Sequence, residues 1–163
     1  MPILLCRVDD RLIHGQVVVG WGAALGIDYV AVVDDDLFDS EWEQDLYRAG
    51  LSETIEARFL NVDEAAVSMP QWSQSQERGF VLTRDVRTMR RLADVGALDD
   101  QEVNLGGLHD APGRRRLLPY LFLADGDVAE LRRLQRSGVR VSAQDVPSAR
   151  RVELDELFEM RSG

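Results

Sequence analysis

The sequence predicts an α/β protein whose mainly parallel, doubly wound sheet carries helices on both faces. Short apolar runs alternate along the chain with longer segments of helical character, and this alternation is typical of a parallel sheet covered on both sides. The chain has 163 residues, of which 45% are hydrophobic, and this size suits one domain with a sizeable core. We therefore expect residues 1–163 to form a single α/β domain.

The expected strands are short apolar runs bounded by polar residues or glycine. In chain order they are residues 3–8, 29–33, 55–60, 80–82, 103–105 and 139–143. Residues 117–123 are a further candidate, and they include Pro119. Because proline has no N–H to donate, this strand is expected only at an edge of the sheet.

The expected helices lie between these strands and have recognisable ends. They cover residues 16–25, 40–49, 63–72, 85–93, 127–138 and 155–160. Ser40 and Glu43 have the spacing of a capping box, in which two side chains satisfy free N–H groups at a helix start. Gly26 follows the first helix, at the position where glycine commonly ends helices.

The segment after the first strand is the most informative one. Residues 9–15 read Asp-Asp-Arg-Leu-Ile-His-Gly, and the first helix follows directly. A helix that starts just after a strand presents free N–H groups and a partial positive charge, so phosphate binds well there. Ligands of such sheets lie at the carboxyl ends of the strands. The segment therefore predicts a phosphate site.

His14 is the expected reactive residue of this site. Its imidazole is nucleophilic and about half charged near neutral pH, so it can take up a phosphoryl group and pass it on. Arg11 can make paired hydrogen bonds to phosphate oxygens. Gly15 lets the backbone approach a phosphate closely.

The same segment resembles a known family. Residues 7–17, with Trp21 beyond them, are similar to the start of the IIB component of the mannose–fructose–sorbose family of the bacterial phosphotransferase system. Similar blocks follow along nearly the whole chain, at residues 29–35, 104–108, 138–139 and 144–147.

The resemblance implies a phosphoryl relay. A phosphohistidine on the IIA component would donate to His14, and His14 would donate to a hexose-type sugar held by the membrane IIC and IID components. The protein would then be a protein-N-phosphohistidine–sugar phosphotransferase with no metal or organic cofactor. The resemblance also implies phosphate contact at Arg11 and a small hydroxyl residue near the phosphate, close to Thr83.

The neighbouring residues have alternative roles. Asp10, or else Asp9, would orient the imidazole, and we favour Asp10; the alternative is that they brace Arg11 or cap the first helix. Gly15, Gln16 and Thr83 are the expected phosphate-binding residues, although Thr83 could instead cap the helix beside Asp85. His109 is expected in a loop, with a contact to the site or a partner as the alternative.

Asp34 departs from the family, in which asparagine is usual at this position. Its charge would lie at the end of the second strand, beside the expected phosphate site. Repulsion there would weaken phosphate binding or speed its departure.

Composition restricts the remaining choices. The net charge of −10 argues against nucleic acid as a partner. We find no apolar run of about 18 residues and no signal peptide. The single cysteine, Cys6, is expected in the core and fits a reducing cytoplasm. A metal site built from Asp9, Asp10, His14 and His109 lacks a recognisable ligand spacing. We therefore expect a cytoplasmic protein that associates peripherally with its permease.

Two rival functions remain at this point. The protein could be a regulatory phosphoprotein of an incomplete phosphotransferase system, or a phospho-ligand binding module without turnover. The sequence names neither the sugar nor the oligomeric state, and a homodimer is left open.

Overall fold

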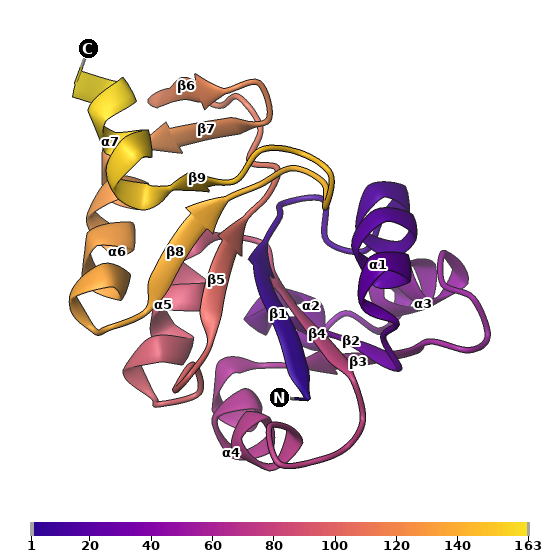
Figure 1. Ribbon diagram of the computed structural model, residues 1–163. Helices are drawn as coiled ribbons and strands as arrows, with labels where there is room; N and C mark the ends of the chain where they lie inside the picture. Colours follow the sequence, from indigo (N-terminus) through magenta and orange to yellow (C-terminus); the bar gives the residue numbers. More distant parts are fainter. Residues whose placement is uncertain (1, 163) are drawn as a thin grey trace.

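A seven-stranded sheet organises the molecule (Figure 1). The computed structural model describes residues 2–162, except for the side chains of Gln16, Arg161 and Ser162. The strands of the sheet are β1 (Ile3–Val8), β2 (Tyr29–Val33), β3 (Glu56–Leu60), β4 (Gly79–Thr83), β5 (Glu102–Leu105), β8 (Arg140–Ala143) and β9 (Val152–Glu153). Their order is β3-β2-β4-β1-β5-β8-β9, and every pair is parallel except β8 with β9. The predicted fold class is confirmed.

Helices cover both faces of the sheet, as expected. They are η1 (Gln16–Gly22), α1 (Ala23–Leu25), α2 (Asp35–Phe38), α3 (Glu41–Ala49), α4 (Val62–Trp72), α5 (Val86–Asp94), α6 (Asp125–Arg136) and α7 (Leu154–Ser162). In Figure 1, α1 and α3 lie on one side of the sheet, and α4, α5 and α6 lie on the other.

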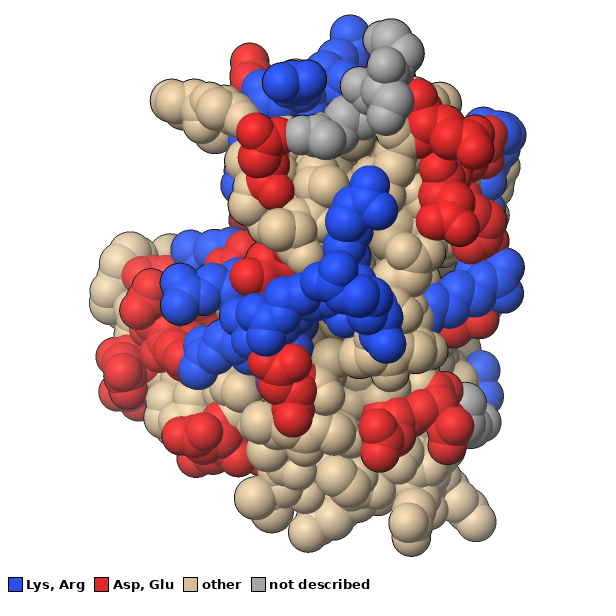
Figure 2. Space-filling view, turned by 90° about the vertical axis from the view of Figure 1, so that its left-hand side faces the viewer, with Lys and Arg blue, Asp and Glu red and all other residues tan. Residues whose placement is uncertain are grey.

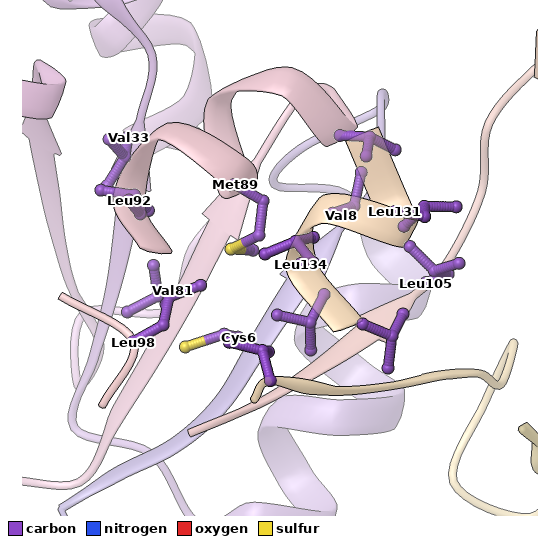
Figure 3. Packing of buried hydrophobic residues seen from close by; sticks show 14 of the residues in the cluster. Cys6, Val8, Val33, Val81, Met89, Leu92, Leu98, Leu105, Leu131 and Leu134 are labelled. Carbon is purple, nitrogen blue, oxygen red and sulfur yellow. The ribbon is translucent and has the colours of Figure 1, made fainter. Parts of the chain in front are cut away.

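Two apolar clusters lie on the two faces because side chains alternate along each strand. On β2, Tyr29 and Val33 belong to the larger cluster with α4, α5 and α6, whereas Val30 and Val32 belong to the smaller cluster with η1. Figure 3 shows Cys6 within the larger cluster. Cys6 is fully buried in the core, as expected, and this burial raises the pKa of its thiol to about 12.

The first helix differs from the expectation in its winding. Residues 16–22 form a π-helix, and only residues 23–25 are α-helical before Gly26 ends the helix with a φ of 64°. π-Helical segments are rare and occur frequently at functional sites. Apolar spacing could predict a helix here but not this winding, because both helix types place apolar residues on one face.

Two local predictions were wrong. Ser40 precedes α3, but its side chain makes no capping hydrogen bond. Gln44 instead ties the start of α3 to α2 by donating to the carbonyls of Leu37 and Phe38. Residues 117–123 are not an edge strand of the main sheet. They belong to a separate hairpin of β6 (Arg114–Leu118) and β7 (Leu121–Ala124), with Pro119 in its turn, where a fixed φ is favourable.

Candidate functional site

The segment of residues 9–15 leaves the carboxyl end of β1, between β4 and β5. The N–H of Asp9 donates to the carbonyl of Thr83 at 3.0 Å, and the N–H of Asp10 donates to the carbonyl of Gly107 at 2.9 Å. The chain thus continues both neighbouring ladders beyond the last residue of β1. Three segments far apart in sequence meet at this point, as the topology predicted.

Asp9 is the hub of this site. Its side chain is fully buried and accepts hydrogen bonds from the backbone N–H, Nε and Nη2 of Arg11 at 3.1–3.2 Å. Nη2 of Arg7 donates to it at 3.2 Å, and the N–H of Gly107 at 3.3 Å. Burial alone would raise the pKa of this carboxyl, but the hydrogen bonds from Arg11 and the charges of both arginines outweigh burial and lower it. Asp9 is therefore an ionised anchor for two guanidinium groups.

Arg7 is a buried cation that our reading of the sequence did not single out. Its other hydrogen bonds reach the side chain of Asn104 and the carbonyls of Gln144 and Asp145, at 2.8 and 2.9 Å for the carbonyls. Its guanidinium also lies over the ring of Trp21, 5.3 Å from the ring centroid. Arg7 therefore ties β5, η1 and the loop after β8 to the site. The signal in the sequence was an arginine inside an otherwise apolar strand.

The two glycines after β5 make room for these arginines. A Cβ on Gly106 would lie 2.3 Å from the guanidinium of Arg7, and one on Gly107 would lie 2.9 Å from that of Arg11. Such contacts are too close for real atoms, and Arg7 cannot move because it is enclosed. The Gly-Gly pair therefore admits two charged side chains at the end of β5.

Neither ring nitrogen of His14 is exposed to solvent and free of contacts: Nδ1 faces a backbone carbonyl and Nε2 is buried. Nδ1 lies 2.8 Å from the carbonyl oxygen of Leu12, and Leu12 adopts a left-handed φ of 55°, which is unusual for a branched residue. Nε2 is buried, has no hydrogen-bond partner among the described residues, and lies 4.0 Å from a carboxylate oxygen of Asp9. The imidazole must therefore turn before either nitrogen can reach a phosphorus atom.

Asp9, and not the favoured Asp10, is the carboxylate near the imidazole. Asp10 accepts a hydrogen bond from the N–H of His109 at 2.9 Å, and its other oxygen lies 2.6 Å from Nδ1 of His109. Arg114 is 3.9 Å from Asp10 and donates to the carbonyl of His109 at 2.8 Å. Asp10 thus connects the loop before η1 to the loop after β5. The choice between adjacent carboxylates depended on side-chain direction, which reverses at each residue.

The other expected phosphate ligands differ in how much space lies around them. A Cβ on Gly15 would meet no atom within 4 Å, so space for a ligand is open there. The side chain of Gln16 lies outside the described residues. Thr83 is fully buried and its hydroxyl donates to the carbonyl of Asp85 at 2.9 Å. Asp85, not Thr83, caps α5 through the N–H of Thr88.

The carboxylate of Asp34 is bound by a helix N–H group and by an arginine. Its carboxylate accepts a hydrogen bond from the N–H of Leu37 at 2.9 Å, which caps α2, and lies 3.1 Å from Nε of Arg84. The expectation of an uncompensated charge beside the phosphate site is not supported by these contacts.

A hollow of about 420 Å³ adjoins the site on the side of the hairpin. Its lining includes Arg11, Gly107, His109, Tyr120 and Asp145. Arg11 has about a third of its side chain exposed, so one edge of its guanidinium can face a ligand while the other binds Asp9. Among the described residues, no three His, Cys, Asp or Glu side chains gather as a metal ion would require.

Comparison with known proteins agrees with this arrangement. The family model described as "PTS system sorbose subfamily IIB component" matches residues 3–162. The N-acetylgalactosamine-specific phosphotransferase enzyme IIB component 1 of Escherichia coli is 31% identical over 156 residues, which cover 94% of this chain and 97% of that protein.

Two solved structures share the fold as well as the sequence. The crystal structure of the same Escherichia coli component has a TM-score of 0.86 with 30% identity, and the match covers 93% of this chain and 99% of that one. The IIBSor domain of the sorbose permease from Klebsiella pneumoniae also has a TM-score of 0.86, with 28% identity and 98% coverage of both chains. The chain belongs to the sorbose subfamily of phosphotransferase system IIB components.

Proposed function

We propose that this protein is a phosphocarrier, with residues 1–163 acting as one IIB domain. His14 takes a phosphoryl group from the phosphorylated IIA component and gives it to a hexose-type sugar bound by the IIC and IID permease. Components of this family are phosphotransferases and work with IIA and IIC/IID partners in general. The assignment of His14 and its neighbours is our own proposal.

One observation carries this proposal. The chain places an imidazole and an anchored guanidinium on the same short turn, at the carboxyl end of the central strand. Asp9 holds the guanidinium of Arg11 by two of its nitrogens, so this group is oriented before any phosphate arrives. Phosphoryl transfer needs mainly such positioning and charge stabilisation.

The chemistry consists of two displacements at phosphorus. In the first, the lone pair of a neutral His14 nitrogen forms an N–P bond while the N–P bond to the donor histidine breaks. In the second, a sugar hydroxyl forms an O–P bond while the N–P bond to His14 breaks, and the hydroxyl proton ends on the released imidazole. Arg11 and the first N–H groups of η1 stabilise the negative oxygens in both steps. Asp9 keeps Arg11 in place and stays ionised.

The partners and location follow from this scheme. We propose that the protein works in the cytoplasm against the inner face of its permease. Among the described residues, no helix is both long and apolar enough to cross a bilayer.

The regulatory alternative is not favoured, because the related proteins carry names of sugar-specific components. Those names cover more than one sugar, so they do not identify the sugar. In our proposal the permease selects it.

Phosphoryl uptake tests the proposal directly. Incubation with phosphorylated IIA should label the protein with an acid-labile, base-stable phosphate, and His14→Ala should take up none. His109→Ala is the matched control, since it removes the other histidine of the chain and should label normally. Normal labelling of His14→Ala would overturn the assignment.

A further inference from the structure

An exposed apolar surface lies on α3, beside the loop that carries His14. Trp42 and Leu46 are 67% and 64% exposed, and they lie one turn apart on the same face of the helix. Together with Ile13, Glu43 and Tyr47 they line a hollow of about 420 Å³. Ile13 directly precedes His14 in the chain, so this surface, which we call the α3 face, adjoins the reactive loop.

The α3 face is surrounded by negative charge. Residues 34–47 contain seven acids and no basic residue. Asp34, Asp35 and Asp45 are paired with arginines. Within residues 2–162, by contrast, no described basic side chain lies within ion-pair distance of Asp39, Glu41 or Glu43. We call these three carboxylates the acidic rim of the α3 face, and their negative charge is uncompensated within the described residues.

A group of basic side chains lies together on another side of the molecule. Figure 2 shows them as a broad blue band on the side where α5 and α6 lie in Figure 1. These two helices cover the opposite face of the sheet from η1. This band therefore lies away from the acidic, apolar α3 face, which is the surface beside His14.

We propose that the α3 face docks on the cytoplasmic loops of the membrane permease. This inference rests on the proposed function and deepens it by naming the surface. Cytoplasmic loops of membrane proteins carry an excess of Lys and Arg, which complements the acidic rim, whereas an anionic lipid surface repels it. No such general excess of positive charge is expected of the soluble IIA donor.

The shape of the surface supports a protein partner. Interfaces combine an apolar centre with a polar rim, and tryptophan is prominent among the residues that dominate binding energy. A large aromatic ring left two-thirds exposed in the free protein has no role in the core. Docking there would cover Trp42 and Leu46 and bring the His14 loop against the permease.

The test separates docking from phosphoryl uptake. Wild type and Trp42→Ala are first phosphorylated by phospho-IIA. Sugar phosphorylation is then measured with proteoliposomes of phosphatidylcholine that hold the cognate IIC and IID components. We expect Trp42→Ala to take up phosphate from IIA at the wild-type rate and to show a KM for the permease at least about tenfold higher. Val67→Ala, at an equally exposed valine on α4, is the matched control and should change neither value.

A charge variant tests the rim. Asp39→Asn with Glu41→Gln and Glu43→Gln should raise the same KM and weaken its dependence on salt, because screening acts on the lost charges. Co-sedimentation of the unphosphorylated protein with the proteoliposomes, against empty ones, measures docking without chemistry and should weaken in parallel.

Three results would overturn the proposal. The KM for the permease could stay unchanged in Trp42→Ala. Uptake from IIA could fall as much as transfer to sugar, which would assign the α3 face to the donor. Wild type could instead be a concentration-dependent dimer that Trp42→Ala converts to monomer, which would assign it to a second copy. Failure of wild type to label from IIA would contradict the proposed function itself, while co-sedimentation would still measure docking.

Discussion

Arg7 and Arg11 bind the same carboxylate from two different regions of the molecule. Arg7 is fully buried in the sheet and has hydrogen bonds to three other residues besides Asp9. Arg11 lies on the loop, has about a third of its side chain exposed, and lines the hollow beside the site. The same ion-pair chemistry therefore serves assembly of the fold in one case and, in our proposal, phosphate contact in the other. Burial makes the difference, because an enclosed cation cannot reach a ligand.

The largest effect is expected at the buried arginine. Arg7→Met leaves the buried Asp9 without one of its counter-charges and removes one donor from each of the carbonyls of Gln144 and Asp145, which costs about 3–5 kcal/mol of unfolding free energy. Urea denaturation measures this, with Arg116→Met at an exposed arginine of β6 as the control. Equal midpoints for Arg7→Met and wild type would show that the buried network contributes nothing to stability.

Asp9 should affect stability in a pH-dependent way. Asp9→Asn removes charged hydrogen bonds and should cost about 1.5–3 kcal/mol near pH 7. The pKa of Asp9 is lowered in the folded state, so its contribution is full above the unfolded pKa, about 3.9, and is lost as pH falls through the folded value.

The free-energy difference between wild type and Asp9→Asn should therefore shrink below about pH 4. Urea titrations between pH 7 and pH 3 measure it, and Asp110→Asn, at an exposed aspartate, serves as the reference. A difference that stays constant with pH would show that Asp9 titrates alike in both states.

Arg11 should affect rate more than stability. Arg11→Lys keeps the charge but loses the planar fork, and one charged hydrogen bond is worth about 1.5–3 kcal/mol. We therefore expect transfer from phospho-IIA to slow by about 10- to 100-fold, in rapid-quench measurements, while the unfolding midpoint stays close to that of wild type. Wild-type transfer rates in both Arg11→Lys and Arg11→Ala would make Arg11 a structural residue like Arg7.

The smallest effect on stability and on phosphoryl transfer is expected at Asp34, which contacts neither Arg7 nor Arg11 in the hydrogen bonds and ion pairs described above. Asparagine caps helices as well as aspartate, and the ion pair with the partly exposed Arg84 is worth at most about 1 kcal/mol. Asp34→Asn should also leave the equilibrium distribution of phosphate between IIA and this protein unchanged. A shift toward the phosphorylated form would revive repulsion between Asp34 and the phosphorylated site.

Apolar patterning was sufficient for the central strands. β1 and β2 have the predicted bounds, because a buried strand is a nearly continuous apolar run, broken in β1 only by Arg7, with polar residues beyond its ends. The same pattern was insufficient for the hairpin and α2. β6 begins with three arginines, and α2 is a single four-residue turn of two aspartates, a leucine and a phenylalanine, so neither is long or apolar enough to show a repeat.

The candidate site was predictable in composition but not in its internal pairing. The segment 9–15 predicted a phosphate site at the end of β1, and this site and His14 remain predictions that the labelling experiment tests. Asp10 was favoured over Asp9 because both are adjacent carboxylates in the sequence. Their contacts differ because the chain continues the sheet hydrogen bonds through Asp9 and Asp10, so one side chain points into the buried network and the next points toward His109.

The sequence by itself determined the alternation of strands and helices, the buried strands and the turn that carries His14 after the first strand, since these depend on local patterns of polarity and backbone preference. Only the tertiary structure decided which charges are paired. Arg7 reaches residues 97 and more positions away, and Gly106 is required by an arginine on the neighbouring strand. Such contacts depend on strand order and register, which arise when the whole sheet assembles and which no short segment contains.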